Sequence, residues 1–324
     1  MNEHILTGLD GSNPLAFLAA LGVLVALDHQ HDVEHFGAEA SRPRLSWRLD
    51  GVWRPVITSE HADAEELVGA LEWDRTQVQA DEALAFGFDE LKVRNGQQSV
   101  ERRRDVNCSP VFLASTLRQW VPATSPRHRR SLDWFTSFVS EGAVSSGKGT
   151  AKGTNLHFTA GGQQFVAQAE LLAHETTTHE LANAVFGLWA YASPQPNMRW
   201  DNTACREHAL RATTPESAES KLGNRGADWL AVRGLILYTT VGRGSRRTNT
   251  PGAIRVPRGQ TWPMWTPSLA LMTVKSLIST APERLSPGEQ YRRGVALVYH
   301  SGIRVIGQGY GNATPATLYE PRHD

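Results

Sequence analysis

The segment from Gly242 to Gly252 combines the residue types that bind phosphate groups. Glycine and serine leave room for a ligand beside the backbone, and serine and threonine hydroxyls can donate hydrogen bonds to it. The basic residues of this segment are Arg243, Arg246 and Arg247. Arg255 and Arg258 follow it without an acidic neighbour. A guanidinium group can match two phosphate oxygens at once. The segment therefore predicts contact with nucleic acid, with a solvated loop or an acidic protein neighbour as alternatives.

Weaker basic clusters elsewhere could add phosphate contacts. They comprise Lys92, Arg94, Arg102, Arg103, Arg104, Lys148 and Lys152, and residues 127–130 are similar. Asn95 lies in a polar turn with Gln97 and Gln98, whose side-chain amides carry the donors and acceptors that read base edges. Most tryptophans should belong to the core. Those that could stack on bases, if they are exposed, are Trp120, Trp262 and Trp265.

Residues 142–149 nearly match the phosphate-binding loop of nucleotide-binding proteins. That motif needs Ser or Thr after its lysine to hold magnesium, and Gly149 follows Lys148 instead. The flanking residues favour a helix before the segment and a strand after it, which reverses the order that the motif requires. We therefore expect a flexible basic loop over residues 141–154, with Lys148 and Lys152 acting as simple charges.

Two groups of histidines could in principle hold a metal ion. His174 and His179 are five positions apart in an expected helix, which turns the second imidazole away from the first. Residues 29–32 follow the first apolar helix and offer no convincing fourth ligand. No motif of a catalytic serine is present. We expect no catalytic residue, no metal and no cofactor. A metal-dependent nuclease that uses His174, His179 and Asp201 is the alternative.

The hydrophobic pattern predicts helices and strands without repeating β-α-β units. Asn13 and Pro14 are typical of a helix start, and the helix to about Leu27 is apolar on nearly all sides, so it should be central and buried. Further helices are expected over 63–71, 110–120, 131–139, 163–189, 227–237 and 269–278. Hairpins or extended segments are expected over 45–57, 156–159, 198–200, 207–211 and 294–306, the last as two strands joined near residue 301. The expected class is α+β, as a single domain over residues 1–324 or as two lobes that meet at the loop 141–154.

Composition indicates the cellular setting. The chain has 33 Lys and Arg and 33 Asp and Glu, so a local patch rather than net charge must hold any polyanion. The 2 cysteines form no CxxC motif, which suits a reducing compartment. The apolar run Leu15–Leu27 is shorter than the roughly 20 residues that cross a bilayer, and no Lys or Arg precedes Arg42 to begin a signal peptide. We therefore expect a cytoplasmic protein without membrane contact.

Several short segments share one resemblance. Residues 8–15 read GLDGSNPL and lead into FLAALG over 17–22. Later segments that fit the same likeness, in order along the chain, are 156–165, 199–201, 208–211, 223–231, 261–265 and 274–277. Together they resemble proteins of the type I-U/I-G CRISPR group, within the divergent large-subunit-like family.

This resemblance implies a non-enzymatic subunit of a Cascade-type surveillance complex. Such a subunit would contact target DNA, guide RNA and other CRISPR effector subunits. It would help to recognise the short motif beside a DNA target and hold the opened strands, while the guide reads the sequence. Residues that read the flanking motif cannot be matched from the family, so the site residues above rest on their chemistry. The alternatives are the nuclease and a scaffold that bridges protein partners.

Overall fold

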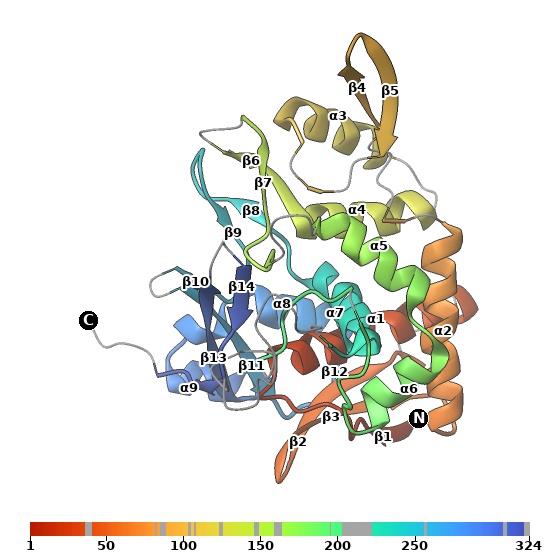
Figure 1. Cartoon of the computed structure of the whole chain (residues 1–324). Coiled ribbons are helices and arrows are strands. Elements are labelled where there is room, and N and C mark those ends of the chain that lie inside the picture. Colours follow the sequence, from red (N-terminus) through yellow and green to blue (C-terminus); the bar gives the residue numbers. More distant parts are fainter. Residues whose placement is uncertain are drawn as a thin grey trace, which may run out of the picture.

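A computed structural model gives the fold of the chain (Figure 1). It describes residues 1–35, 41–81, 83–84, 89–102, 105–106, 108–122, 126–145, 149–158, 164–194, 196–202, 222–255, 258–306 and 310–320. Helices and antiparallel sheets mix in one structure, which confirms the α+β class. The predicted extended segment 207–211 lies outside the described residues.

The first helix, α1 (Pro14–His35), forms the centre of the core, as its all-round apolarity predicts. It packs mainly against α7 (Arg225–Gly234) and also against α2 (Ala64–Ala80). Among the described helices α1 alone is long and apolar enough to cross a membrane, but 89% of its most apolar window is buried inside the protein. That burial is typical of the core helix of a soluble protein.

The helix α1 continues past Leu27, where the apolar run ends, because its later polar residues have partners. Asp28 accepts a hydrogen bond from Arg42 at 2.9 Å, and His31 Nε2 lies 2.8 Å from the hydroxyl of Ser41. A side-chain network also ties α1 to its neighbours. Its members are buried or half-buried, so they fix the crossing of several helices.

The centre of this network is Asp74 of α2, which is fully buried. Arg233 of α7 donates to Asp74 from Nε at 2.7 Å and from Nη2 at 2.8 Å, and His29 Nδ1 lies 2.5 Å from the same carboxylate. Arg130 of α4 (Pro126–Phe138) donates to His29 Nε2 at 2.7 Å and pairs with Asp81. The expectation that residues 127–130 form a basic surface cluster is therefore wrong for Arg130, because internal partners hold its charge.

Two antiparallel sheets flank the helices. The first has the order β1 (Asn2–Ile5), β3 (Val52–Ser59), β2 (Arg44–Asp50) and β12 (Leu269–Ala270), and its β2–β3 hairpin was predicted. The second pairs β10 (Ala253–Arg255) with β11 (Arg258–Trp265), and β11 with β13 (Val295–Ile306). The strands β14 (Tyr310–Ala313) and β15 (Thr317–Leu318) complete it beside β13.

Three sequence-based elements were wrong. The expected hairpin over 294–306 is the single strand β13, because Gly302 pairs with Gly259 of β11 instead of making a turn. The expected helix 163–189 is two helices, α5 (Phe165–Glu175) and α6 (Thr178–Phe186), because Thr177 and Glu180 form a capping box that starts a new helix. The expected strand at 156–159 begins in a turn, and the strand β7 (Ala151–Gly153) precedes it.

The remaining elements include three hairpins at one end of the protein, at the top of Figure 1. They are β4 (Asp89–Arg94) with β5 (Gln97–Arg102), β6 (Val139–Val144) with β7, and β8 (Val241–Gly242) with β9 (Thr248–Asn249). The helix α3 (Pro110–Trp120) lies beside them and has the predicted bounds. The other helices are α8 (Leu271–Ser279), α9 (Pro287–Arg292), η3 (Leu235–Leu237) and η4 (Pro282–Arg284).

Candidate nucleic-acid interface

The β8–β9 hairpin exposes the three arginines of the glycine-rich segment at its tip. Arg243, Arg246 and Arg247 are all exposed. The backbone amide of Arg243 donates to the carbonyl of Arg247 at 2.7 Å, and Gly244 has a φ of 65°, so the chain turns tightly between them. No ion pair among the described residues involves these three guanidinium groups. We name this cluster the arginine tip.

Buried hydroxyl groups hold the base of this hairpin to the rest of the protein. Thr240 donates to the carbonyl of Ser137 at 2.6 Å, and Thr248 donates to the carbonyl of Gly153 at 3.0 Å. Thr250 and Asn155 exchange two hydrogen bonds, of 3.0 and 3.1 Å, between backbone amides and side-chain oxygens. The arginine tip therefore extends from a fixed base, which reduces the ordering that a ligand would have to impose.

The β6–β7 hairpin lies directly against the arginine tip, although about a hundred residues separate them in sequence. The amide of Val144 donates to the carbonyl of Ser245 at 2.9 Å. Gly142 and Gly242 touch through their backbones, since a Cβ added to Gly242 would lie 2.7 Å from the carbonyl carbon of Gly142. The two glycine-rich segments that sequence reasoning treated separately therefore form one surface.

Lys152 contributes to this surface from β7, where it is half-buried opposite Ser140. Lys148 lies outside the described residues. Exposed Glu141 of β6 is the acidic side chain of the same hairpin and reduces the local positive charge. The expected helix does precede this segment, as α4, which ends at Phe138. The segment itself was expected to be a loop, but the strands β6 and β7 form much of its described part. The strand β7 occupies the place where a phosphate-binding loop would require a helix.

The β4–β5 hairpin brings polar amides to the same end of the protein. Asn95 and Gly96 have φ values of 52° and 78°, which is the backbone of a tight two-residue hairpin turn. Asn95, Gln97 and Gln98 are exposed at this turn. The basic residues on its two strands are Lys92, Arg94 and Arg102, whereas Arg103 and Arg104 lie outside the described residues.

The second sheet carries the last two basic residues of the prediction. Arg255 of β10 pairs with Arg258 of β11 in the antiparallel register, so both lie at the turn between these strands. The side chain of Arg258 is exposed. The structure thus places both arginines at one end of the β10–β11 pair.

The suggestion that tryptophans stack on bases is wrong for all three candidates. Trp262 and Trp265 are fully buried and donate from Nε1 to the carbonyls of Gly11 and Leu45, at 2.8 and 2.9 Å. Trp120 is only 9% exposed and packs edge-to-face on Phe135. Their burial makes all three core residues, where burial of a large ring stabilises most.

The residues of the nuclease alternative do not form a cluster. His174 lies in the last turn of α5 and His179 lies in α6, and both are exposed. Asp201 is buried and accepts a hydrogen bond from Asn13 at 2.9 Å. Within the described ranges, no three His, Cys, Asp or Glu side chains come together as a set that could hold a metal ion.

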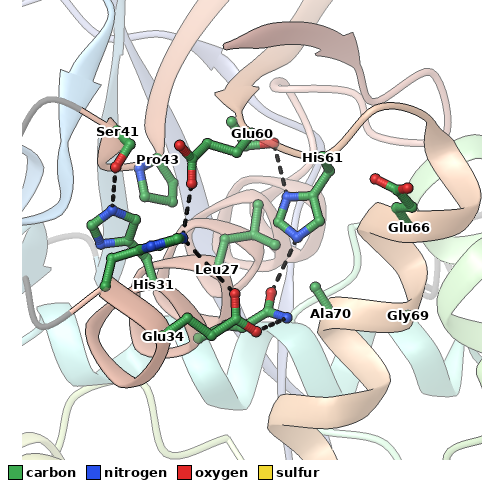
Figure 2. A pocket seen from close by; sticks show the side chains of 13 residues that line it. Leu27, His31, Glu34, Ser41, Pro43, Glu60, His61, Glu66, Gly69 and Ala70 are labelled. Atoms are coloured by element: carbon green, nitrogen blue, oxygen red, sulfur yellow. Dashed lines mark hydrogen bonds and ion pairs between the residues drawn. The ribbon is translucent and has the colours of Figure 1, made fainter. Parts of the chain in front are cut away.

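Sequence reasoning did not predict a cavity of about 430 Å³ between the end of α1, the end of β3 and the start of α2 (Figure 2). Its lining is rich in imidazoles and carboxylates. These are His31, His35, His61, Glu34, Glu60 and Glu66. Of the histidines that sequence reasoning singled out, His31 lines the cavity. The cavity itself was not predicted, because most of its lining comes from segments after α1.

The polar groups of this cavity mostly satisfy one another. His35 Nε2 lies 2.9 Å from Glu60, and His61 bridges Ser59 and Gln30 with two contacts of 3.1 Å. Burial lowers the pKa of His61, against the opposing charge of Glu66. The cavity belongs to α1, β3 and α2, none of which contributes to the three hairpins. It is therefore separate from the candidate interface.

Comparisons of the chain with protein-family models, with curated proteins and with solved structures found no match.

Proposed function

We propose that this protein is a non-catalytic, cytoplasmic subunit of a type I CRISPR surveillance complex that contacts target DNA, guide RNA or both. The resemblance of its opening residues to the I-U/I-G group motivates the choice of complex. Other effector subunits would then be its protein partners, and recognition of the flanking motif and retention of the opened strands would be its tasks.

One observation carries the nucleic-acid part of this proposal. The arginine tip presents Arg243, Arg246 and Arg247 to solvent from a hairpin whose base is fixed by buried threonines. Arginine forks that no described acidic residue pairs with suit phosphate oxygens, and the neighbouring glycines let a sugar-phosphate backbone come close. Lys152 and the amide-bearing β4–β5 hairpin lie at the same end of the protein, so phosphate and base contacts could act together.

The test is the salt dependence of binding to a labelled 20-nucleotide DNA, single-stranded or duplex. Arg246→Ala combined with Arg247→Ala should weaken binding and reduce the slope of log affinity against log salt by about 0.7 to 0.9 for each lost phosphate contact. The control is Arg44→Ala combined with Arg48→Ala, which removes two exposed arginines from β2, one of them paired with Glu3.

The control pair should bind as the parent does, because β2 lies outside the hairpin group. If both double variants retain the parental affinity and slope, the arginine tip does not hold phosphates. Parental protein that binds no nucleic acid, yet uses the tip to bind an acidic protein, would favour the bridging scaffold instead.

A further inference from the structure

The short helix α9 presents an aromatic ring that has no packing role. Tyr291 is 83% exposed, whereas the large rings of the core are almost completely buried. Arg292 and Arg293 follow it and are also exposed. This tyrosine contributes little to the stability of the fold, because its ring stays in water. Its surface is instead available to a flat ligand.

Several contacts hold this helix in place. Ser286 and Glu289 form a capping box at its start, and the Gln290 amide donates to the carbonyl of Pro282 at 2.8 Å. Gly294 ends the turn with a φ of 74° and lies against Pro267, where a Cβ would come within 2.3 Å of the proline ring. Tyr291 is therefore presented by a fixed element rather than by a loose loop.

The charges around Tyr291 favour a polyanion. Arg292, Arg293 and Arg284 are exposed, and the neighbouring carboxylates are those of Glu283 and Glu289. Glu283 is buried and lies 3.4 Å from Arg284, and Glu289 is committed to its hydrogen bonds with Ser286. The exposed surface thus carries more positive than negative charge around one free aromatic face.

The second sheet connects this surface to the predicted basic residues. The pairing of β11 with β13 begins at Gly259 and Gly302, next to Arg258, and ends at Trp265 and Val295, three residues after α9. Seven residue steps along a strand span roughly 23 Å. A short stretch of nucleic acid could cover that distance, since a single-strand-binding OB fold occupies about 4 to 16 nucleotides.

We propose that Tyr291, Arg292 and Arg293 form a second contact site, which holds a single-stranded nucleic acid by stacking a base on Tyr291 and pairing phosphates with the two arginines. The same nucleic-acid strand would extend along the exposed side of β13 toward Arg258. This inference rests on the proposed nucleic-acid function and adds a site to it. An unpaired strand is required because a base inside a duplex has no free face for the ring.

The test compares Tyr291→Ala with Tyr291→Phe in binding to labelled oligo(dT) and oligo(U) of 20 nucleotides and to a duplex of 20 base pairs. Loss of the ring should weaken single-strand binding by about five- to a hundred-fold. The Phe variant should bind like the parent, because stacking needs the ring and not the hydroxyl. Duplex binding should be equal in all three proteins.

Salt dependence separates stacking from phosphate contact. Tyr291→Ala should leave the salt slope unchanged, whereas Arg292→Ala combined with Arg293→Ala should reduce it by about 0.7 for each arginine. A preference for oligo(dT) or oligo(U) identifies the strand as DNA or RNA, and either supports the site.

Two failures are distinguishable. If the parent binds single strands, the Arg246→Ala and Arg247→Ala protein binds them weakly, and Tyr291→Ala binds like the parent, then the proposed function stands and this site is refuted. If the parent binds no nucleic acid, both proposals are refuted.

Discussion

A single added methyl group should disrupt the crossing of the two central helices. Gly22 of α1 faces the backbone of α7, and a Cβ placed on it would lie 1.7 Å from the carbonyl oxygen of Leu230 and 2.5 Å from its carbonyl carbon. Gly234 makes the reciprocal contact, since its Cβ would lie 2.3 Å from the carbonyl oxygen of Leu18. Backbone atoms cannot rotate away as side chains do, so Gly22→Ala must push the helices apart.

The cost of that change can be estimated against a control in the same protein. Overpacking a core costs about 1 to 3 kcal/mol, and Ala in place of Gly inside a helix gains roughly 0.5 to 1 kcal/mol. Because the clash is with backbone, we take the upper overpacking cost of about 3 kcal/mol, less about 1 kcal/mol for the helix gain, and expect Gly22→Ala to lower the free energy of unfolding by about 2 kcal/mol. Gly69→Ala, in the exposed face of α2 with no atom within 4 Å of the new Cβ, should raise it by roughly 0.5 to 1 kcal/mol.

Urea denaturation followed by circular dichroism measures both changes. An unchanged slope of unfolding free energy against urea concentration shows that the variants expose the same surface on unfolding as the parent. A Gly22→Ala protein as stable as the Gly69→Ala protein would show that α1 and α7 do not approach each other this closely.

Two further predictions concern buried carboxylates. Asp74→Asn should lower the free energy of unfolding, measured by urea denaturation, by about 3 to 5 kcal/mol, because it leaves Arg233 buried without its carboxylate. The double variant Asp74→Leu with Arg233→Met should restore much of that loss, because it removes both charges. Equal stability of the single and double variants would contradict this. Burial raises the pKa of Asp228 to about 8. Above about pH 4 the unfolded chain therefore releases the Asp228 proton that the folded protein still holds. As a result the free energy of unfolding falls as the pH rises from about 4 to about 8. Asp228→Asn can still accept the 2.9 Å hydrogen bond from the amide of Met198, so it should be more stable than the parent at pH 7.5 and equal to it near pH 4. Thermal unfolding measures the difference. The same difference between variant and parent at both pH values would refute the raised pKa.

Local patterns in the sequence determined the parts of the fold that depend on neighbouring residues. The apolar residues from Leu15 to Leu27 predicted the buried central helix, and Asp50 with Gly51 predicted the turn between β2 and β3, where Gly51 has a φ of 68°. The helix α3 also has its predicted bounds, and the Ser109 cap and Pro110 that begin it act within one turn of helix. The exposure of the arginines in the 242–252 segment could also be predicted, because a glycine-rich segment with several charges rarely packs into a core.

Tertiary structure alone decided which distant segments meet. Nothing near Gly142 in sequence indicates that its backbone touches Gly242, nor that Glu60 of the β3 end faces His35 of α1. Burial of Trp262 and Trp265 likewise depends on acceptors at Gly11 and Leu45, more than two hundred residues away in the chain. Capping, turn and periodicity signals act over a few residues, whereas these contacts arise from how whole helices and sheets pack, and that packing is set by the complete set of side chains and not by any one segment.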